Sequence, residues 1–167
     1  MNSKAAKNAV TWPEEIFEVL KDVGIRQAAY VPDAGHARLI ALCQTDETMR
    51  AVPLTTEEEG VALLAGAWLG GERGVLLMQS SGVGNCINML AMAAEYRFPL
   101  LMLVTMRGEW GEFNPWQIPM GQNARRVLED MGVGIYYVDE TQRLAETVNA
   151  AARLAFDTSR MVAVIIS

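Results

Sequence analysis

Residues 74–85 read GVLLMQSSGVGN, and this stretch indicates the fold class most clearly. The run from Val75 to Met78 is apolar without interruption, which is typical of a strand buried on both faces of a parallel sheet. The segment 80–85 is small, polar and rich in glycine, and it predicts a loop. Residues 86–96 carry small side chains on one side and predict a helix. This order of elements predicts one unit of an α/β domain.

The same alternation continues on both sides of this unit. The patterns predict strands at residues 27–31, 49–54, 74–79, 99–105, 135–138 and 161–166. They predict helices at residues 12–23, 36–44, 57–69, 86–96, 124–131 and 141–158. Because none of the connections is a tight hairpin, we expect a doubly wound sheet of about six parallel strands with helices on both faces. Residues 1–10 are expected to be an N-terminal tail and residues 11–167 one domain.

Composition excludes several functional classes. The length of 167 residues fits one domain, and the net charge of −6 disfavours a nucleic-acid or anionic-membrane surface. Two cysteines, Cys43 and Cys86, are too few for a disulfide framework and fit a reducing compartment. We find no signal peptide and no apolar run long enough to span a bilayer, and expect a cytoplasmic protein.

Ligands of open parallel sheets bind where the strands end, so the loops after the strands are the candidate sites. The glycine-containing segment 80–85 can direct backbone amides and a helix N-terminus at an anion or a polar ring. It lacks the third glycine of a dinucleotide fingerprint and the Lys-Ser/Thr of a P-loop. A plain strand-to-helix turn is the alternative reading.

Two further features follow strand ends. Three glutamates at 57–59 begin a predicted helix, where they stabilise the helix dipole, and one of them can face a cleft. In a low-dielectric cleft a carboxyl group can exchange protons near neutral pH, but the pattern does not show which glutamate does so. His36, the one histidine, follows the first strand and is either a site residue or a surface residue at a helix start.

Two familiar kinds of site are disfavoured. One histidine and two distant cysteines do not form a zinc ligand set. Ser80 and Ser81 lack the G-x-S-x-G elbow of a serine hydrolase. The long segment 107–122 is a better candidate, because a loop of this length in a compact domain is usually functional or a partner contact. Arg107 within it suits an anionic substrate group, and packing on another subunit is the alternative.

The segment 55–68, TTEEEGVALLAGAW, resembles the glutamate-containing helix of thiamine-diphosphate enzymes. In that superfamily the pyrimidine-binding domain has a glutamate nine positions before a glycine, and counting back from Gly66 selects Glu57. The resemblance implies that Glu57 hydrogen-bonds the aminopyrimidine ring of the cofactor and favours the imino tautomer. Residues 11–167 are then a pyrimidine-binding domain.

Four shorter segments narrow the resemblance. VPD at 31–33, SGVGNCIN at 81–88, RGE at 107–109 and PMGQ at 119–122 resemble sulfopyruvate decarboxylase alpha subunits and the N-terminal half of phosphonopyruvate decarboxylases. The similarity covers roughly residues 14–167. The superfamily's Gly-Asp-Gly…Asn motif, which holds magnesium and diphosphate, does not occur in the sequence. The resemblance therefore implies a beta subunit that holds Mg²⁺ and the diphosphate, in a hetero-oligomer with at least two copies of each chain.

The implied activity is the decarboxylation of a 3-substituted pyruvate such as sulfopyruvate, a small anionic 2-oxo acid, to CO₂ and an aldehyde. Other thiamine-dependent decarboxylases or carboligases, acting on phosphonopyruvate or an apolar 2-oxo acid, and a non-catalytic regulatory subunit remain alternatives. Glu57 is the expected catalytic residue, and no metal ligand is expected in this chain. The other expected site residues are, for the cofactor, Ser81, Gly82, Val83 and Asn85 and, for the substrate, Asp33, His36, Arg107, Gln117 and Gln122.

Overall fold

The computed structural model describes residues 11–139 and 143–167. It contains strands β1 (Ile25–Tyr30), β2 (Arg50–Pro53), β3 (Arg73–Gln79), β4 (Leu100–Thr105), β5 (Gly134–Val138) and β6 (Met161–Ile166). The helices are α1 (Trp12–Asp22), α2 (Ala37–Thr45), α3 (Glu57–Leu69), α4 (Ser80–Glu95), α5 (Ile118–Asp130) and α6 (Leu144–Thr158), with a 3₁₀ turn η1 (Pro115–Gln117). Among these residues no helix is long and apolar enough to cross a membrane.

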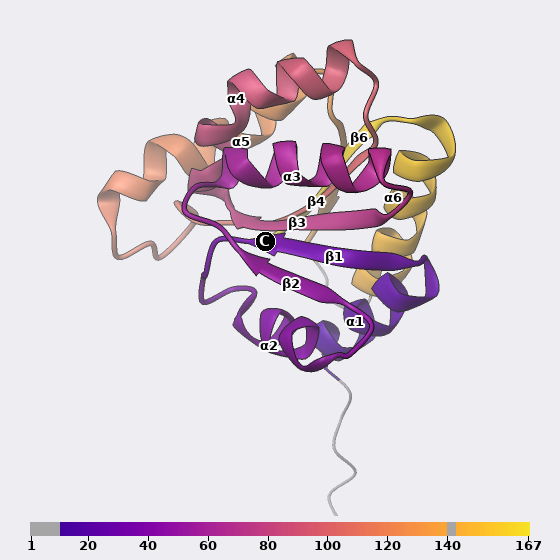
Figure 1. Ribbon diagram of the computed structural model, residues 1–167. Coiled ribbons are helices and arrows are strands. Elements are labelled where there is room, and N and C mark those ends of the chain that lie inside the picture. The colour runs from indigo at the N-terminus through magenta and orange to yellow at the C-terminus, as the bar shows by residue number, and fades with distance from the viewer. Residues whose placement is uncertain (1–10, 140–142) are drawn as a thin grey trace, which may run out of the picture.

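The six strands form one sheet in the order β2-β1-β3-β4-β6-β5, and every neighbouring pair is parallel (Figure 1). The doubly wound fold is therefore confirmed. Strands β4 and β6 are buried along their whole length, as expected for central strands covered by helices on both faces. The chain moves outward from β1 to β2 and then returns to β3 on the other side. This reversal puts the topological switch point between β1 and β3.

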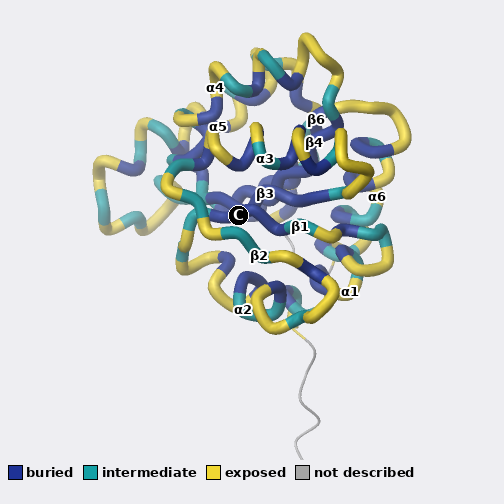
Figure 2. Tube along the Cα trace, viewed as in Figure 1, coloured by how far each residue is buried: buried dark blue, intermediate teal, exposed yellow. Residues whose placement is uncertain are grey.

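The helices pack as two layers, each with its own apolar cluster. Helices α1, α2 and α6 cover one face of the sheet, and α3, α4 and α5 cover the other (Figure 1). The buried positions along the tube in Figure 2 follow the strands and the inner sides of these helices. Gly60 lets α3 approach the sheet closely, because a Cβ there would overlap Leu76 and Leu54. This close approach positions the start of α3 beside the switch point.

The structure corrects two predicted boundaries. Residues 80–85 are not a loop: α4 begins at Ser80, directly after the extended Gln79 at the end of β3. Glycine content suggested a turn, but neither glycine of the segment has a positive φ, so the segment can continue as helix. Helix α5 begins at Ile118 rather than at residue 124, with Pro119 tolerated in its first turn. The predicted tail at 1–10 and the predicted start of the last helix at 141 lie outside the described residues.

Candidate functional site

The candidate site lies at the carboxyl ends of β1, β3 and β4, which are neighbours in the centre of the sheet. Asp33 and His36 follow β1, Ser80 follows β3 and Arg107 follows β4. Glu57 begins α3, and the Leu54 N–H just before it donates to the Tyr30 carbonyl at the end of β1. The topology thus gathers residues from four segments at the switch point, where open α/β sheets bind their ligands.

Glu57 is the one glutamate of the 57–59 run that faces the interior. Its exposure is 5%, whereas Glu58 and Glu59 are exposed at the surface. The Glu59 carboxylate accepts a hydrogen bond from the Thr55 N–H at 2.8 Å and so caps the start of the helix. The structure therefore separates one buried carboxylate from two that serve the solvated end of α3.

The partners of Glu57 come from the first two turns of α4. Asn85 Nδ2 donates to Glu57 Oε2 at 2.7 Å, and a Cβ added at Gly82 would overlap the Glu57 carboxylate. Gly82 therefore leaves room for the carboxylate between α3 and α4. The one hydrogen bond that the described residues give to the Glu57 carboxylate comes from Asn85 and ends on Oε2, so Oε1 can accept a hydrogen bond from a ligand N–H. Gly66, the glycine of the cofactor-family motif on α3, has no such role, because a Cβ there would have no neighbour within 4 Å.

The sequence between β1 and α2 builds a buried carboxylate–imidazole pair. The His36 backbone N–H donates to Asp33 Oδ1 at 3.0 Å, and His36 Nδ1 lies 3.0 Å from Asp33 Oδ2. The Thr105 hydroxyl lies 3.4 Å from the same Oδ1. Burial pushes the pKa of Asp33 upward, but hydrogen bonds and charge from His36, with the Gly35 backbone, outweigh it and lower that pKa. His36 is fully buried, and its Nε2 has no hydrogen-bond partner among the residues that the structure describes.

Arg107 is held by a residue that the sequence did not single out. Glu112 accepts from Arg107 Nε at 2.8 Å and from Nη2 at 2.6 Å, and also from the backbone N–H groups of Gly108 and Asn114 at 2.9 Å each. The hydrogen bonds from Arg107, then those from Gly108 and Asn114, lower the pKa of Glu112 to about 2. The sequence analysis expects Arg107 to bind an anionic group of the substrate. In the structure Glu112 already accepts hydrogen bonds from its Nε and Nη2.

The remaining predicted residues are distributed unevenly. Gln117 is buried, and its Oε1 has no hydrogen-bond partner within residues 11–139 and 143–167, whereas Gln122 is exposed on α5. Ser81 is half-buried at the start of α4. Val83 is fully buried in the apolar cluster beneath α4 and presents no accessible surface to a ligand.

Sequence reasoning placed Ser80 and Glu112 in candidate segments without giving either a role in the site, and it missed Thr105. The Ser80 hydroxyl accepts the Arg107 backbone N–H at 3.0 Å and connects the ends of β3 and β4. One signal was available, since Val83, Cys86, Leu90 and Ala93 recur at helical spacing and are all buried. This helical spacing begins at Val83 and therefore places part of the predicted loop 80–85 within α4.

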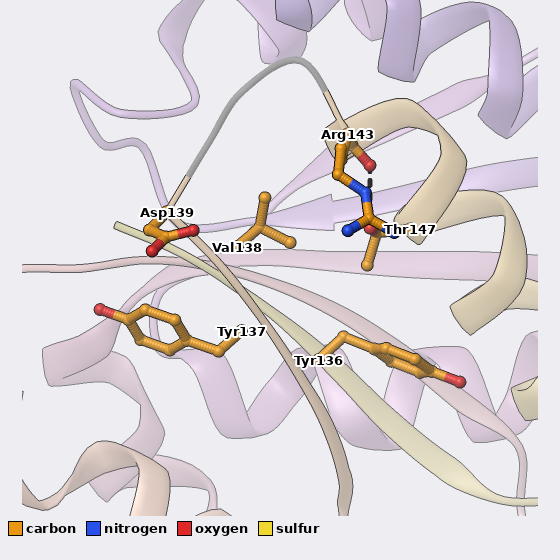
Figure 3. A pocket seen from close by; sticks show the side chains of 6 residues that line it. All are labelled: Tyr136, Tyr137, Val138, Asp139, Arg143 and Thr147. Atoms are coloured by element: carbon orange, nitrogen blue, oxygen red, sulfur yellow. Dashed lines mark hydrogen bonds between the residues drawn. The ribbon is translucent and has the colours of Figure 1, made fainter.

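A separate cavity of about 420 Å³ lies at the edge strand β5 (Figure 3). Its lining includes Tyr136 and Tyr137, which point apart, and Arg143, whose carbonyl accepts the Thr147 hydroxyl at 2.8 Å. Strands β4 and β6 separate β5 from the switch point, so this cavity is distinct from the Glu57 site. Within 11–139 and 143–167 there is no group of three or more His, Cys, Asp or Glu side chains able to hold a metal ion.

The fold and the hydrogen bond between the exposed Asn85 and the buried Glu57 carboxylate define an α/β domain with a candidate ligand site at the topological switch point. A family model described as the N-terminal TPP binding domain of thiamine pyrophosphate enzymes matches residues 11–116. The chain belongs to this family, which confirms the resemblance read from the sequence; thiamine pyrophosphate and thiamine diphosphate are the same cofactor.

Individual relatives agree with the family. The chain is 32% identical to sulfopyruvate decarboxylase subunit alpha of Methanothermobacter thermautotrophicus, covering 92% of this chain and 93% of that one. It is 30% identical to the same subunit of Methanococcus maripaludis, covering 92% of each. Phosphonopyruvate decarboxylase of Streptomyces viridochromogenes is 32% identical, covering 80% of this chain and 34% of that protein.

A solved structure shares the fold. The 2-oxoglutarate:ferredoxin oxidoreductase from Magnetococcus marinus superposes with a TM-score of 0.70 at 13% identity. The match covers 95% of this chain and 28% of that longer chain. At this identity the likeness concerns the architecture alone.

Proposed function

We propose that this chain is the alpha subunit of a thiamine-diphosphate-dependent decarboxylase that converts sulfopyruvate to sulfoacetaldehyde and CO₂. The observation that carries the proposal is the buried Glu57 carboxylate at the switch point. One of its oxygens is held by Asn85, and the other is free to accept a hydrogen bond. The match to the family of TPP-binding domains supports the same cofactor.

The residues around Glu57 suit the pyrimidine end of thiamine diphosphate. When bound, this cofactor supplies the electron sink that lets a 2-oxo acid lose CO₂. Glu57 Oε1 would accept an N–H of the aminopyrimidine and exchange a proton with the ring, while Asn85 keeps the carboxylate oriented. Gly82 leaves room for the carboxylate itself, the Ser81 side chain would border the ring, and Val83 would support this part of α4 from the apolar cluster beneath it.

The substrate end of the site is proposed to lie beside the Asp33–His36 pair. Because its pKa is lowered, Asp33 remains an ionised hydrogen-bond acceptor at neutral pH. In the described part of the chain His36 Nε2 and Gln117 Oε1 are buried without partners, an arrangement that costs about 1–3 kcal/mol per group unless a ligand group pairs with it. Both atoms are therefore suited to hold polar atoms of a small anionic 2-oxo acid.

Arg107 and Gln122 are proposed to recognise the anionic tail of the substrate. While Glu112 holds Nε and Nη2, Arg107 can offer its third nitrogen, Nη1, to the tail. Gln122 is exposed on α5 and can contribute its amide from that side. Because Glu112 compensates most of the Arg107 charge, further cationic groups for the tail are proposed to come from the partner subunit.

The magnesium ion and the diphosphate are proposed to be held by a beta subunit. Two relatives of nearly the same length as this chain are named as alpha subunits, which supports a second chain. We further propose a hetero-oligomer with at least two copies of each chain. The free thiols of Cys43 and Cys86 support a reducing compartment such as the cytoplasm.

Sulfopyruvate is favoured over phosphonopyruvate because the sulfopyruvate relatives match more of this chain. Two separate alpha subunits of sulfopyruvate decarboxylases match 92% of this chain, whereas the longer sulfopyruvate decarboxylase of Methanosarcina acetivorans matches over 38% of its own length. The phosphonopyruvate relative is about three times longer, since its matched part is 34% of its length. Phosphonopyruvate, which has the same 2-oxo acid with a different anionic tail, is the second candidate substrate.

The proposal is tested by measuring CO₂ release with purified subunits. We expect release from sulfopyruvate only when this chain, its beta subunit, Mg²⁺ and thiamine diphosphate are all present, and slower release from phosphonopyruvate and from apolar 2-oxo acids. Equal rates on an apolar 2-oxo acid would contradict the substrate class. In calorimetry the cofactor should bind tightly only to the assembled pair, so nanomolar binding to this chain alone would contradict the divided site.

A further inference from the structure

The segment between β4 and α5 displays three large aromatic side chains to solvent. We define the aromatic loop as residues 107–117. Within it Trp110 is fully exposed, Phe113 is 81% exposed and Trp116 is 68% exposed. Figure 1 shows this loop and the start of α5 projecting on the left, beyond the carboxyl ends of the strands, and Figure 2 shows that the projection is largely exposed.

The backbone of the aromatic loop is held in place from inside. Glu112 receives four hydrogen bonds from three residues of the loop, as described above. Glu109 connects the loop to the sheet, because it accepts the Tyr137 hydroxyl at 2.9 Å and the Ser167 hydroxyl at 2.7 Å. The two acidic side chains thus anchor the loop, while Trp110 and Trp116 are exposed and the Phe113 ring lies 5.3 Å from the Arg107 guanidinium.

A glycine turn completes this anchoring. Gly108 adopts a φ of +77°, and a Cβ there would lie 2.6 Å from the Gln117 carbonyl oxygen, so the two ends of the loop pack directly together. A preordered loop loses little conformational entropy when a partner binds, and aromatic residues on such a loop are typical binding hot spots. The loop therefore has the properties of a docking surface.

The aromatic loop is continuous with the half-site at Glu57. The Ser80 hydroxyl at the start of α4 accepts the Arg107 N–H, and two residues further on Gly82 faces the Glu57 carboxylate. A Cβ at Gly84 of the same helix would lie 3.2 Å from the sulfur of Met120 on α5. A protein that covers the Glu57 site at this edge of the sheet therefore meets the loop as well.

We propose that the aromatic loop is the docking surface for the subunit that completes the cofactor site. This inference rests on the proposed function. A second copy of this chain would bring another Glu57 half-site, whereas the diphosphate end needs a different chain. The area is adequate: aromatic side chains bury about 150–250 Å² each, so three supply most of the roughly 800 Å² that each partner contributes to a standard interface.

The test compares two pairs of exposed apolar residues. Trp110→Ser with Trp116→Ser removes the centre of the docking surface. Leu69→Ser with Tyr96→Ser is the matched control, because these two side chains are similarly exposed, at 75% and 69%. They lie at or just beyond the carboxyl ends of α3 and α4, away from the ends of the strands where Glu57 lies. Circular dichroism should show unchanged folding for both variants, since none of the four side chains is in the core.

Affinity for the beta subunit is then measured by sedimentation or by calorimetry with the full chains. We expect the aromatic variant to raise the Kd by at least about thirtyfold, the size of one hot spot, and the control to change it less than threefold. Hydrogen exchange of residues 107–117 should slow when the beta subunit binds wild-type chain. An unchanged Kd, or exchange that does not slow, would overturn the proposal.

Two outcomes separate the loop from its alternatives. If the aromatic variant abolishes self-association of this chain and leaves the beta subunit bound, the surface serves a second copy and the proposal fails. Glu57→Gln should leave the Kd for the beta subunit unchanged. If wild-type subunits assemble through the loop yet release no CO₂ from any 2-oxo acid, docking stands and the proposed function fails.

Discussion

Replacing Gly82 with alanine tests the packing that the site depends on. The new Cβ would overlap the Glu57 carboxylate, so either the carboxylate or α4 must move. Overpacking of this kind costs about 1–3 kcal/mol, and the gain from alanine over glycine in a helix offsets about 0.5–1 kcal/mol of it. We therefore expect a net loss of roughly 0.5–2 kcal/mol in the free energy of unfolding.

Gly66→Ala is the matched control, because it also lies inside a helix but its Cβ would meet nothing within 4 Å. It should stabilise the chain by about 0.5–1 kcal/mol. In thermal unfolding of a chain of this size, Gly82→Ala should lower Tm by roughly 1–8 °C and Gly66→Ala should raise it by roughly 1–4 °C. In the assembled enzyme Gly82→Ala should also reduce kcat by up to about 10²-fold, because Glu57 is displaced. A Gly82→Ala chain that is as stable and as active as Gly66→Ala would refute the reasoning.

Two further predictions concern titrating groups. Burial raises the pKa of Cys43 and of Cys86 to about 12, so at pH 8 about one thiol in ten thousand is ionised. A thiol reagent should leave both unmodified in the native chain and modify both in guanidinium, and rapid native labelling would contradict their burial. Glu112 has a pKa of about 2 in the folded chain, below its ordinary value of 4.5, so its contribution to stability is complete above pH 4.5 and is lost as the pH falls through 2. The stability gap between wild type and Glu112→Gln, measured by urea unfolding, should shrink over that range; a gap independent of pH would argue against the ion pair.

The fold was predictable because its signals are local. The apolar runs of β3, β4 and β6 are buried on both faces, which made these strands readable without any knowledge of their neighbours. The predicted start of α4 at residue 86 is wrong because Gly82 and Gly84 are poor helix formers, so local propensity favours a turn over residues 80–85. Glycine is needed at position 82 because any side chain there would overlap the Glu57 carboxylate. This contact joins residues 25 positions apart, so no local sequence pattern indicates it.

The site was predictable in part for similar reasons. The residue pattern left three glutamates equivalent, and the resemblance selected Glu57, which the structure buries. The Arg107–Glu112 pair was not foreseen, because both residues lie in an irregular loop whose geometry has no sequence period. The sequence leaves His36 open as a surface or a site residue, because its complete burial depends on how α2 packs on the sheet.

The central claim, that the Glu57 carboxylate drives the reaction, is tested most directly by Glu57→Gln in the assembled enzyme. Glu58→Gln on the same helix turn is the control, because Glu58 is exposed to solvent. Loss of a general acid–base group typically costs about 10²–10⁴-fold in rate. The account predicts a loss of kcat in that range for Glu57→Gln, with unchanged assembly, and a wild-type kcat for Glu58→Gln. A Glu57→Gln enzyme that retains full decarboxylase activity would contradict it.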